Sequence, residues 1–211
     1  MQTVTDILEF CRSQIGVAED PLGSNNVVYN TDYYGKPVSG DKYPWCCVFL
    51  WDVFRLCGAS GLFYGGKKTA SCITLLEWAA KQKLTVPLCD VKPGDIVFFD
   101  WNSNGVPDHV GICETASGTA TITAIEGNTG DMVRRRTRNR IDICGVFRPL
   151  YQTEDGRYQT VDQLPRWYQD AIKDYIKEGA LAGDNKGLDL SDDMARTLTI
   201  VWRYINNAKG K

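Results

Sequence analysis

The chain has 211 residues, enough for one domain of ordinary size and a small appendage. Hydrophobic residues make up 43% and the net charge is -2, which gives no overall reason to expect a nucleic-acid or membrane partner. No apolar run approaches the roughly 18 residues that span a bilayer, and the N-terminus lacks the basic-then-apolar order of a secretory signal. We therefore expect a protein made in the cytoplasm without a signal peptide, which must reach any outside target by another route.

The first part of the chain predicts three helices and one long loop. Residues 3–15 carry apolar side chains at helical spacing between a threonine cap and a glycine stop. Residues 17–43 show no period and are rich in Gly, Asn, Asp and Tyr, which predicts an irregular loop of the length that usually carries function. A strongly apolar helix is expected from Pro44 to Gly58, and a third helix at about 71–83.

From residue 92 onward the pattern changes to alternating polar and apolar residues, which is typical of strands. The Lys-Pro-Gly-Asp sequence at 92–95 predicts a turn, and a hairpin is expected to turn around Ser117 and Gly118. The expected strands are 96–99, 109–115, 120–125 and 145–148. Helices followed by antiparallel strands predict an α+β domain.

The polar segment near the C-terminus separates this domain from a smaller unit. We expect a domain at 1–150, a linker at 151–160 and a helical unit at 161–211. One helix is predicted at 165–178, and Ser191 is expected to cap a second. The apolar residues on one face of that second helix are Met194, Leu198, Val201, Trp202 and Ile205.

Eight cysteines are scattered along the chain, at none of the spacings typical of zinc sites. A disulfide framework is not expected in a chain of this size without an export signal. Most of these thiols therefore fit as small buried apolar side chains. The adjacent cysteines 46 and 47 require a separate interpretation.

A cysteine at the start of a helix is a candidate nucleophile. Thiols react as thiolates, which the free N–H groups and the positive dipole end of a helix N-terminus stabilise. Cys46 lies two residues after Pro44, in the first turn of the expected apolar helix. Cys47 lies about 100° further round the helix axis and therefore cannot face the same cleft.

His109 is the candidate base because the sequence contains no other histidine. It opens an expected strand after a polar loop, where a side chain can project from the sheet edge. If the hairpin turns on residues 117–118, His109 faces Glu126 directly, with Cβ atoms about 5 Å apart. Glu126 would then orient the imidazole as a third catalytic member, and Asn128 shares that face if the strand continues. A structural histidine and an exposed glutamate are the alternatives.

Four short motifs follow one another within residues 3–150. They are Pro44-Trp45-Cys46-x-x-Phe49, Lys92-Pro93-Gly94-Asp95-Ile96-Val97-Phe98-Phe99, Asp108-His109-Val110-Gly111-Ile112 and Glu126-Gly127-Asn128-Thr129. Their order resembles the cysteine, histidine-dependent amidohydrolase/peptidase (CHAP) domain, especially that of phage and prophage endolysins. The resemblance implies a papain-like α+β fold, in which N-terminal helices pack on an antiparallel sheet.

The resemblance also implies a role for each site residue. Cys46 would be the nucleophile, His109 the base, Glu126 the orienting acid and Asn128 a polar partner near it. Cys47 stands where the family usually has a small residue, and we expect it to be a buried bystander.

The activity implied by the resemblance is cleavage of an amide bond in bacterial peptidoglycan during lysis, after release from the host cytoplasm. The bond could be the N-acetylmuramoyl–L-alanine amide or a peptide link of the stem or cross-bridge. Three alternatives stay open: a bacterial wall-remodelling hydrolase, a catalytically inactive wall-binding module, and a cytoplasmic thiol peptidase that acts on proteins.

Two polar segments carry weaker predictions. Thiol chemistry requires no cofactor, but the loop 100–108 copies part of an EF-hand-like calcium loop, and Asx-rich turns are the alternative. The hypothetical calcium ligands are Asp100, Asn102, Asn104 and Asp108. The arginines 134, 135, 136, 138 and 140 are expected to split across two faces of a solvated edge or turn. Contact with anionic wall polymers is a weaker hypothesis, and no motif supports nucleic-acid binding.

The C-terminal unit resembles a single S-layer-homology-like helical unit. The residues that carry the resemblance run from Val161-Asp162-Gln163-Leu164-Pro165-Arg166-Trp167, through Gly179-Ala180-Leu181-Ala182-Gly183-Asp184, to Leu188-Asp189-Leu190-Ser191. It implies attachment to a secondary wall polymer. Docking on the catalytic domain or on a second copy of the unit is the alternative.

Overall fold

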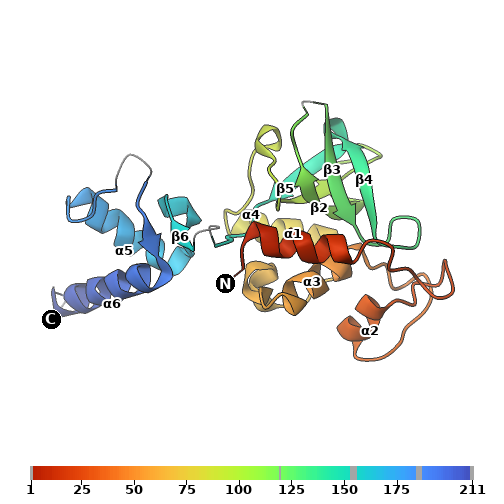
Figure 1. Ribbon diagram of the computed structural model, residues 1–211, viewed down its shortest axis with the longest axis horizontal. Coiled ribbons are helices and arrows are strands. Elements are labelled where there is room, and N and C mark those ends of the chain that lie inside the picture. The colour runs from red at the N-terminus through yellow and green to blue at the C-terminus, as the bar shows by residue number, and fades with distance from the viewer. Residues whose placement is uncertain (1, 119, 153–155, 184–186, 210–211) are drawn as a thin grey trace. The chain divides into compact units, whose positions relative to one another are not determined.

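The computed structural model describes residues 2–118, 120–152, 156–183 and 187–209 (Figure 1). The chain divides into two compact units, Gln2–Pro149 and Leu150–Lys211. No helix within the described residues is long and apolar enough to cross a membrane.

Four α-helices form the helical part of the larger unit. They are α1 (Val4–Ser13), α2 (Val28–Tyr34), α3 (Cys46–Leu56) and α4 (Cys72–Lys81). Thr3 caps α1 in a reciprocal capping box with Asp6, and Ser71 caps α4 by accepting a hydrogen bond from the N–H of Thr74. These caps explain why both helices begin where the sequence predicts.

A five-stranded sheet completes this unit, so the expected α+β class is confirmed. The strands are β1 (Ile96–Phe99), β2 (His109–Thr115), β3 (Thr121–Glu126), β4 (Arg134–Asn139) and β5 (Ile143–Phe147). They lie in the order β4-β3-β2-β1-β5 and every neighbouring pair is antiparallel. The helices α1, α3 and α4 lie together on one side of the sheet (Figure 1). Among them, α3 packs against β2 and α4 against β5.

Two of these helices and strands, α2 and β4, were not predicted. The expected loop 17–43 contains α2, whose sequence Val-Tyr-Asn-Thr-Asp-Tyr-Tyr has no apolar stripe. Asn30 stabilises the segment through its side-chain amide, which donates to the backbone carbonyls of Asn25 and Tyr43 at 2.8 and 2.9 Å. The edge strand β4 consists almost wholly of arginine and other polar residues, so tertiary pairing with β3 overrides its weak strand signal.

The described part of the smaller unit contains two short strands and two α-helices. These are β6 (Arg157–Tyr158), α5 (Arg166–Lys177), β7 (Leu190–Ser191) and α6 (Asp192–Lys209), and β6 pairs antiparallel with β7. Its core contains Tyr158, Leu164, Tyr168, Ile172, Leu190 and Ala195.

Two predictions for the smaller unit were wrong in detail. Because β6 belongs to its sheet, the predicted linker 151–160 ends before residue 157; residues 153–155 lie outside the described residues. On α6 the most buried positions are Ala195 and Thr199, whereas Met194 and Val201 of the predicted apolar face are 45% and 43% exposed. Leu198 of the predicted face packs against the core, so the prediction holds for that residue, while α6 contacts α5 along a side that also includes the small residues 195 and 199.

Candidate active site

Cys46 is the first residue of α3, as the sequence predicts for a nucleophile. Trp45 precedes it and is fully buried, and its indole N–H donates to Glu19 Oε1 at 2.8 Å. The following residues 46–54 of α3 are all buried. The helix start is therefore held rigidly, and the Cys46 thiol, in a residue 7% exposed, lies at its tip.

Cys47 is separated from the site in the predicted way. It is 0% exposed, and its thiol donates to the backbone carbonyl of Thr69 at 3.4 Å. The expectation that Cys47 is buried is confirmed.

His109 is the first residue of β2 and pairs with Phe99 of β1. Its Nε2 lies 3.0 Å from Glu126 Oε2, which leaves Nδ1 for a second partner. The rings of Trp101 and Phe99 stack near the imidazole, with centroids 5.4 and 6.3 Å from it. Trp101 is 47% exposed, so it forms the solvent-facing cover of the imidazole.

Glu126 reaches His109, but not by the predicted register. The strands pair Ile112 with Ile125 and Cys113 with Ala124, and a bulge follows Cys113. Continuation of this register sets Glu126 beside Gly111, so the prediction that it directly faces His109 was wrong by two residues. A shift of two residues keeps every side chain on its own face. Glu126 therefore approaches the histidine along the diagonal, which a long side chain can span.

Two glycines make room for this arrangement. A Cβ atom on Gly111 would lie 2.7 Å from Glu126 Cγ, so a side chain there would displace the carboxylate. A Cβ atom on Gly127 would lie 2.5 Å from Phe49 Cβ and 2.9 Å from the Trp45 ring. The close approach at Gly127 brings the end of β3 against the start of α3, and with it Glu126 toward Cys46.

Arg138 is a site residue that the sequence did not reveal. Its guanidinium binds Glu126 through two hydrogen bonds of 2.8 and 2.6 Å and lies over Trp101 at 5.0 Å from the ring centroid. The interpretation of the arginine run as a solvated edge was wrong for Arg138, whose side chain is 22% exposed. The expected split holds, because Arg135 points to the other face and binds Glu114. The alternation of side chains along β4 places Arg138 on the same face of the sheet as Glu126. The contact between the two residues depends on the pairing of β4 with β3.

The charges of the site support one another. Burial raises the pKa of Glu126, but hydrogen bonds from Arg138 and His109 hold it below the usual range of a glutamate. Burial lowers the pKa of His109, while hydrogen bonds with Cys46 and Glu126 raise it to about 9. His109 is therefore a cation at neutral pH, held between the Cys46 thiol and a carboxylate.

The ionisation of Cys46 depends on two neighbours. The pKa of the Cys46 thiol is raised well above its usual value, first by a hydrogen bond with Cys72 and then by burial, and a hydrogen bond with His109 offsets part of this rise. Cys72 thus opposes the ionisation that the helix start and His109 were expected to favour. The reactive form of the pair is a Cys46 thiolate beside the His109 imidazolium.

Asn128 does not continue the strand, contrary to the condition of its prediction. β3 ends at Glu126, and Asn128 has a left-handed backbone with φ of 56°. Strand alternation therefore does not carry the Asn128 side chain onto the face of His109. A catalytic role for Asn128 stays a prediction.

In the polar loop 100–108, the acidic side chains accept hydrogen bonds from backbone N–H groups of the same loop. Asp100 accepts hydrogen bonds from the N–H groups of Asn104 and Gly105, at 3.3 and 2.7 Å. Asp108 accepts one from the N–H of Trp101 at 2.9 Å and contacts the Asn102 amide. Within the described ranges, no group of three or more His, Cys, Asp or Glu side chains is arranged to hold a metal ion.

The calcium hypothesis for Asp100, Asn102, Asn104 and Asp108 predicts a measurable result. Calcium added to chelator-treated protein should release heat in a calorimetric titration and raise the melting temperature, because a bound ion stabilises the folded loop. The variant Asp108→Asn should weaken both effects. Absence of heat together with an unchanged melting temperature would contradict the hypothesis.

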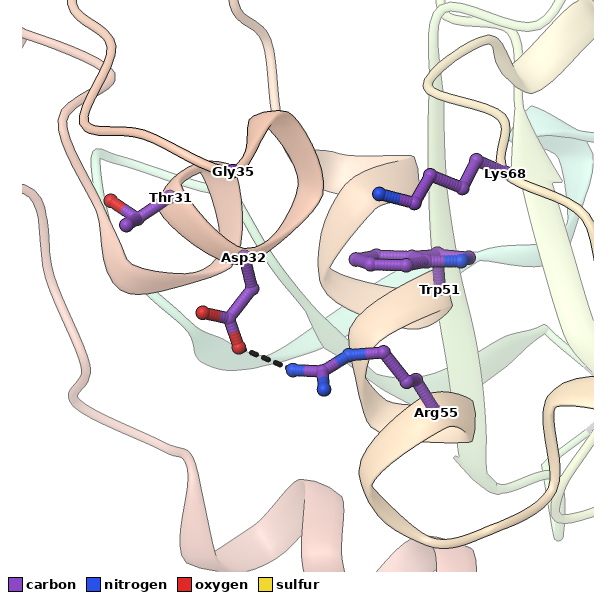
Figure 2. A pocket seen from close by; sticks show the side chains of 6 residues that line it. All are labelled: Thr31, Asp32, Gly35, Trp51, Arg55 and Lys68. Atoms are coloured by element: carbon purple, nitrogen blue, oxygen red, sulfur yellow. Dashed lines mark hydrogen bonds and ion pairs between the residues drawn. The ribbon is translucent and has the colours of Figure 1, made fainter.

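A separate open cavity of about 410 Å³ lies between α2 and α3 (Figure 2). Its lining residues are Thr31, Asp32, Gly35, Trp51, Arg55 and Lys68. The Trp51 ring lies between the cations of Lys68 and Arg55, which are 4.8 and 5.5 Å from its centroid. Arg55 also forms ion pairs with Asp32 and Asp52. These charges neutralise one another, and the cavity contains none of the predicted site residues.

The fold and site together define an α+β domain with a cysteine, a histidine and a glutamate in one cluster. Residues 38–128 match the family model of the CHAP domain, and this segment includes all four predicted catalytic residues. No curated protein matches the chain. A crystal structure of a wild type endolysin, LysIME-EF1, is similar over 95% of this chain and 97% of its own, with 15% sequence identity and a TM-score of 0.47. The CHAP resemblance is thus confirmed for residues 38–128, and the S-layer-homology-like unit stays a prediction.

Proposed function

We propose that this protein is a peptidoglycan hydrolase that cleaves an amide bond with Cys46 as nucleophile. The observation that carries the proposal is the meeting of the α3 start with the His109–Glu126 pair, whose Nε2–Oε2 distance is 3.0 Å. The match of residues 38–128 to the CHAP domain supports the same activity. A catalytically inactive wall-binding module has no need for a thiol held beside a charged imidazole.

The first half of the reaction forms an acyl-enzyme. The Cys46 thiolate attacks the amide carbonyl carbon and forms a C–S bond. The His109 imidazolium then gives its proton to the amine nitrogen as the C–N bond breaks. Glu126, held by Arg138, keeps the imidazole oriented and stabilises its cationic form.

The second half returns the enzyme to its starting state. Neutral His109 takes a proton from water, the water oxygen attacks the thioester carbon, and the C–S bond breaks. The products are a carboxylic acid, the Cys46 thiolate and the His109 imidazolium, so the proton count closes. The developing oxyanion needs hydrogen-bond donors. We assign one donor to the backbone N–H of Cys46. The first hydrogen bond within α3 runs from the N–H of Phe49 to the carbonyl of Trp45, so the N–H of Cys46, which comes earlier, has no partner within the helix.

Digestion of purified sacculi tests the function and identifies the bond. Mass spectrometry of the soluble fragments should show new amine ends on L-alanine for an N-acetylmuramoyl–L-alanine amidase, or within stems or cross-bridges for an endopeptidase. Casein serves as the control substrate for a general thiol peptidase. Cleavage of casein with intact sacculi would overturn the proposal.

The C-terminal unit is proposed to attach the enzyme to a secondary wall polymer. Its α6 helix exposes apolar and aromatic side chains to solvent: Met194, Ile200, Val201, Tyr204 and Ile205. The full chain carrying Cys46→Ala should sediment with sacculi and should be released when the secondary polymer is extracted chemically. Equal sedimentation before and after extraction would contradict this attachment.

A further inference from the structure

A second thiol lies against the candidate nucleophile. The Sγ atoms of Cys46 and Cys72 are 3.7 Å apart. Cys46 opens α3 and Cys72 opens α4, so two helix starts meet at this point. The residues are 7% and 8% exposed. The sequence offered no sign of this contact, because 25 residues separate the two cysteines along the chain.

We propose that Cys46 and Cys72 are a disulfide modification site, at which mild oxidation joins the two sulfurs and removes the nucleophile. A disulfide has a sulfur–sulfur distance of about 2.05 Å, so the two atoms must approach by roughly 1.7 Å. Rotation of each short side chain about its Cα–Cβ bond moves the sulfur without displacing the helix. The loss of hydrolysis rests on the proposed function, whereas formation of the bond does not.

The chemistry balances with a peroxide as the oxidant. The Cys46 thiolate attacks one oxygen of hydrogen peroxide, which yields a sulfenic acid on Cys46 and releases hydroxide. The Cys72 thiol then attacks that sulfenic sulfur, the S–S bond forms, and the departing hydroxyl takes the thiol proton to leave as water. Both sulfurs are oxidised by one electron each, and the peroxide O–O bond accepts the two electrons. An external dithiol reverses the bond by thiol–disulfide exchange.

The surroundings of the pair favour Cys46 as the attacking thiol. His109 stabilises the Cys46 thiolate, and thiolates are the form that peroxides oxidise. The pKa is raised at both thiols, but His109 is not among the groups that act on Cys72, so no neighbouring imidazolium offsets the rise there and Cys72 keeps its proton. A protonated neighbour that cannot compete for peroxide is suited to act second, as the resolving thiol.

Cys47 is the competitor that an experiment must exclude. Cys47 lies close enough to Cys72 to raise the pKa of that thiol. The Cys47 thiol, however, donates to the Thr69 carbonyl, and the residue is fully buried. Trypsin places Cys46 and Cys47 in one peptide, 43–55, and Cys72 in another, 69–81. A cross-link between these peptides in wild type therefore does not show which cysteine is involved.

The test is mass spectrometry of peroxide-treated full-length protein in two matched variants. In Cys47→Ala, a reducible cross-link between peptides 43–55 and 69–81 can only join Cys46 to Cys72, and we expect it. In Cys46→Ala, we expect no such cross-link. Its absence from Cys47→Ala, or its presence in Cys46→Ala, would overturn the proposal. This readout needs no hydrolysis, so it is independent of whether the proposed function is correct.

Activity on sacculi gives the second readout. Peroxide-inactivated wild type should recover most of its activity with dithiothreitol, because the disulfide is reducible. In Cys72→Ser the sulfenic acid lacks its resolving thiol and is oxidised further to forms that dithiothreitol does not reduce, so recovery should fall at least severalfold. Equal recovery in Cys72→Ser and wild type would contradict protection by Cys72. An active, folded Cys72→Ser protein before oxidation is the required control.

Discussion

Cys46→Ala is expected to lower the rate of sacculus digestion by about 10⁴-fold or more, because removal of a nucleophile disables the whole catalytic group. Cys47→Ala is expected to retain most activity, since the Cys47 thiol bonds to a backbone carbonyl outside the site. Each variant loses one sulfur atom, and the two positions are adjacent and both buried. Their comparison therefore separates catalysis from packing.

The measurement is the initial rate of release of soluble wall fragments, with melting temperatures recorded for both variants. Cys46→Ala should melt within a few degrees of wild type, because one small side chain at a helix tip is lost. Full activity in Cys46→Ala would eliminate Cys46 as the nucleophile. Equal losses in both variants, accompanied by lower melting temperatures, would mean that the thiols act only through packing.

Glu126→Gln is expected to reduce activity by about 10² to 10⁴-fold, the range in which loss of the orienting carboxylate falls in related catalytic groups. An amide removes the negative charge that stabilises the His109 imidazolium. It also removes the carboxylate to which the Arg138 guanidinium donates two hydrogen bonds in the wild type. Arg138→Met should show a smaller loss, because Glu126 keeps its charge but loses its anchor.

Arg138→Lys provides the matched control for Arg138→Met. Lysine restores the positive charge but cannot form the two-pronged contact of a guanidinium, so its activity should fall between those of wild type and Arg138→Met. If Arg138→Met equals wild type in rate and in pH profile, Arg138 has no part in positioning Glu126.

The protonation of His109 can be followed directly because the sequence contains a single histidine. In untagged protein, its imidazole proton resonances should titrate with a pKa of about 9. That pKa should fall in Glu126→Gln and in Cys46→Ala, since both partners raise it. An unchanged pKa in Glu126→Gln would contradict the proposed electrostatic support.

The raised pKa of His109 also sets a pH dependence of stability. The folded pKa of about 9 lies above the unperturbed value of 6.5, so the folded state binds the proton more tightly than the unfolded state. The stabilisation from His109 is therefore complete below pH 6.5 and is lost as the pH rises to 9. This pH dependence should weaken in Glu126→Gln.

Local sequence signals determined much of this molecule. Caps, apolar spacing and turn residues predicted α1, α3, α4 and the strands β1, β2 and β3 close to their observed bounds. The same signals placed Cys46 at a helix start and His109 at a strand start. These features depend on residues a few positions apart, which is the range over which hydrogen bonds of helices and turns act.

Tertiary structure decided the features that depend on distant residues. The observed β2–β3 register at Glu126 differs by two residues from the predicted one, and Glu126 stayed on the face of His109 because strand side chains repeat every two residues. Arg138 and Cys72 gained their partners only when β4 paired with β3 and the starts of α3 and α4 met. Neither contact can be predicted from the spacing of residues in the sequence, because each joins side chains that are far apart along the chain.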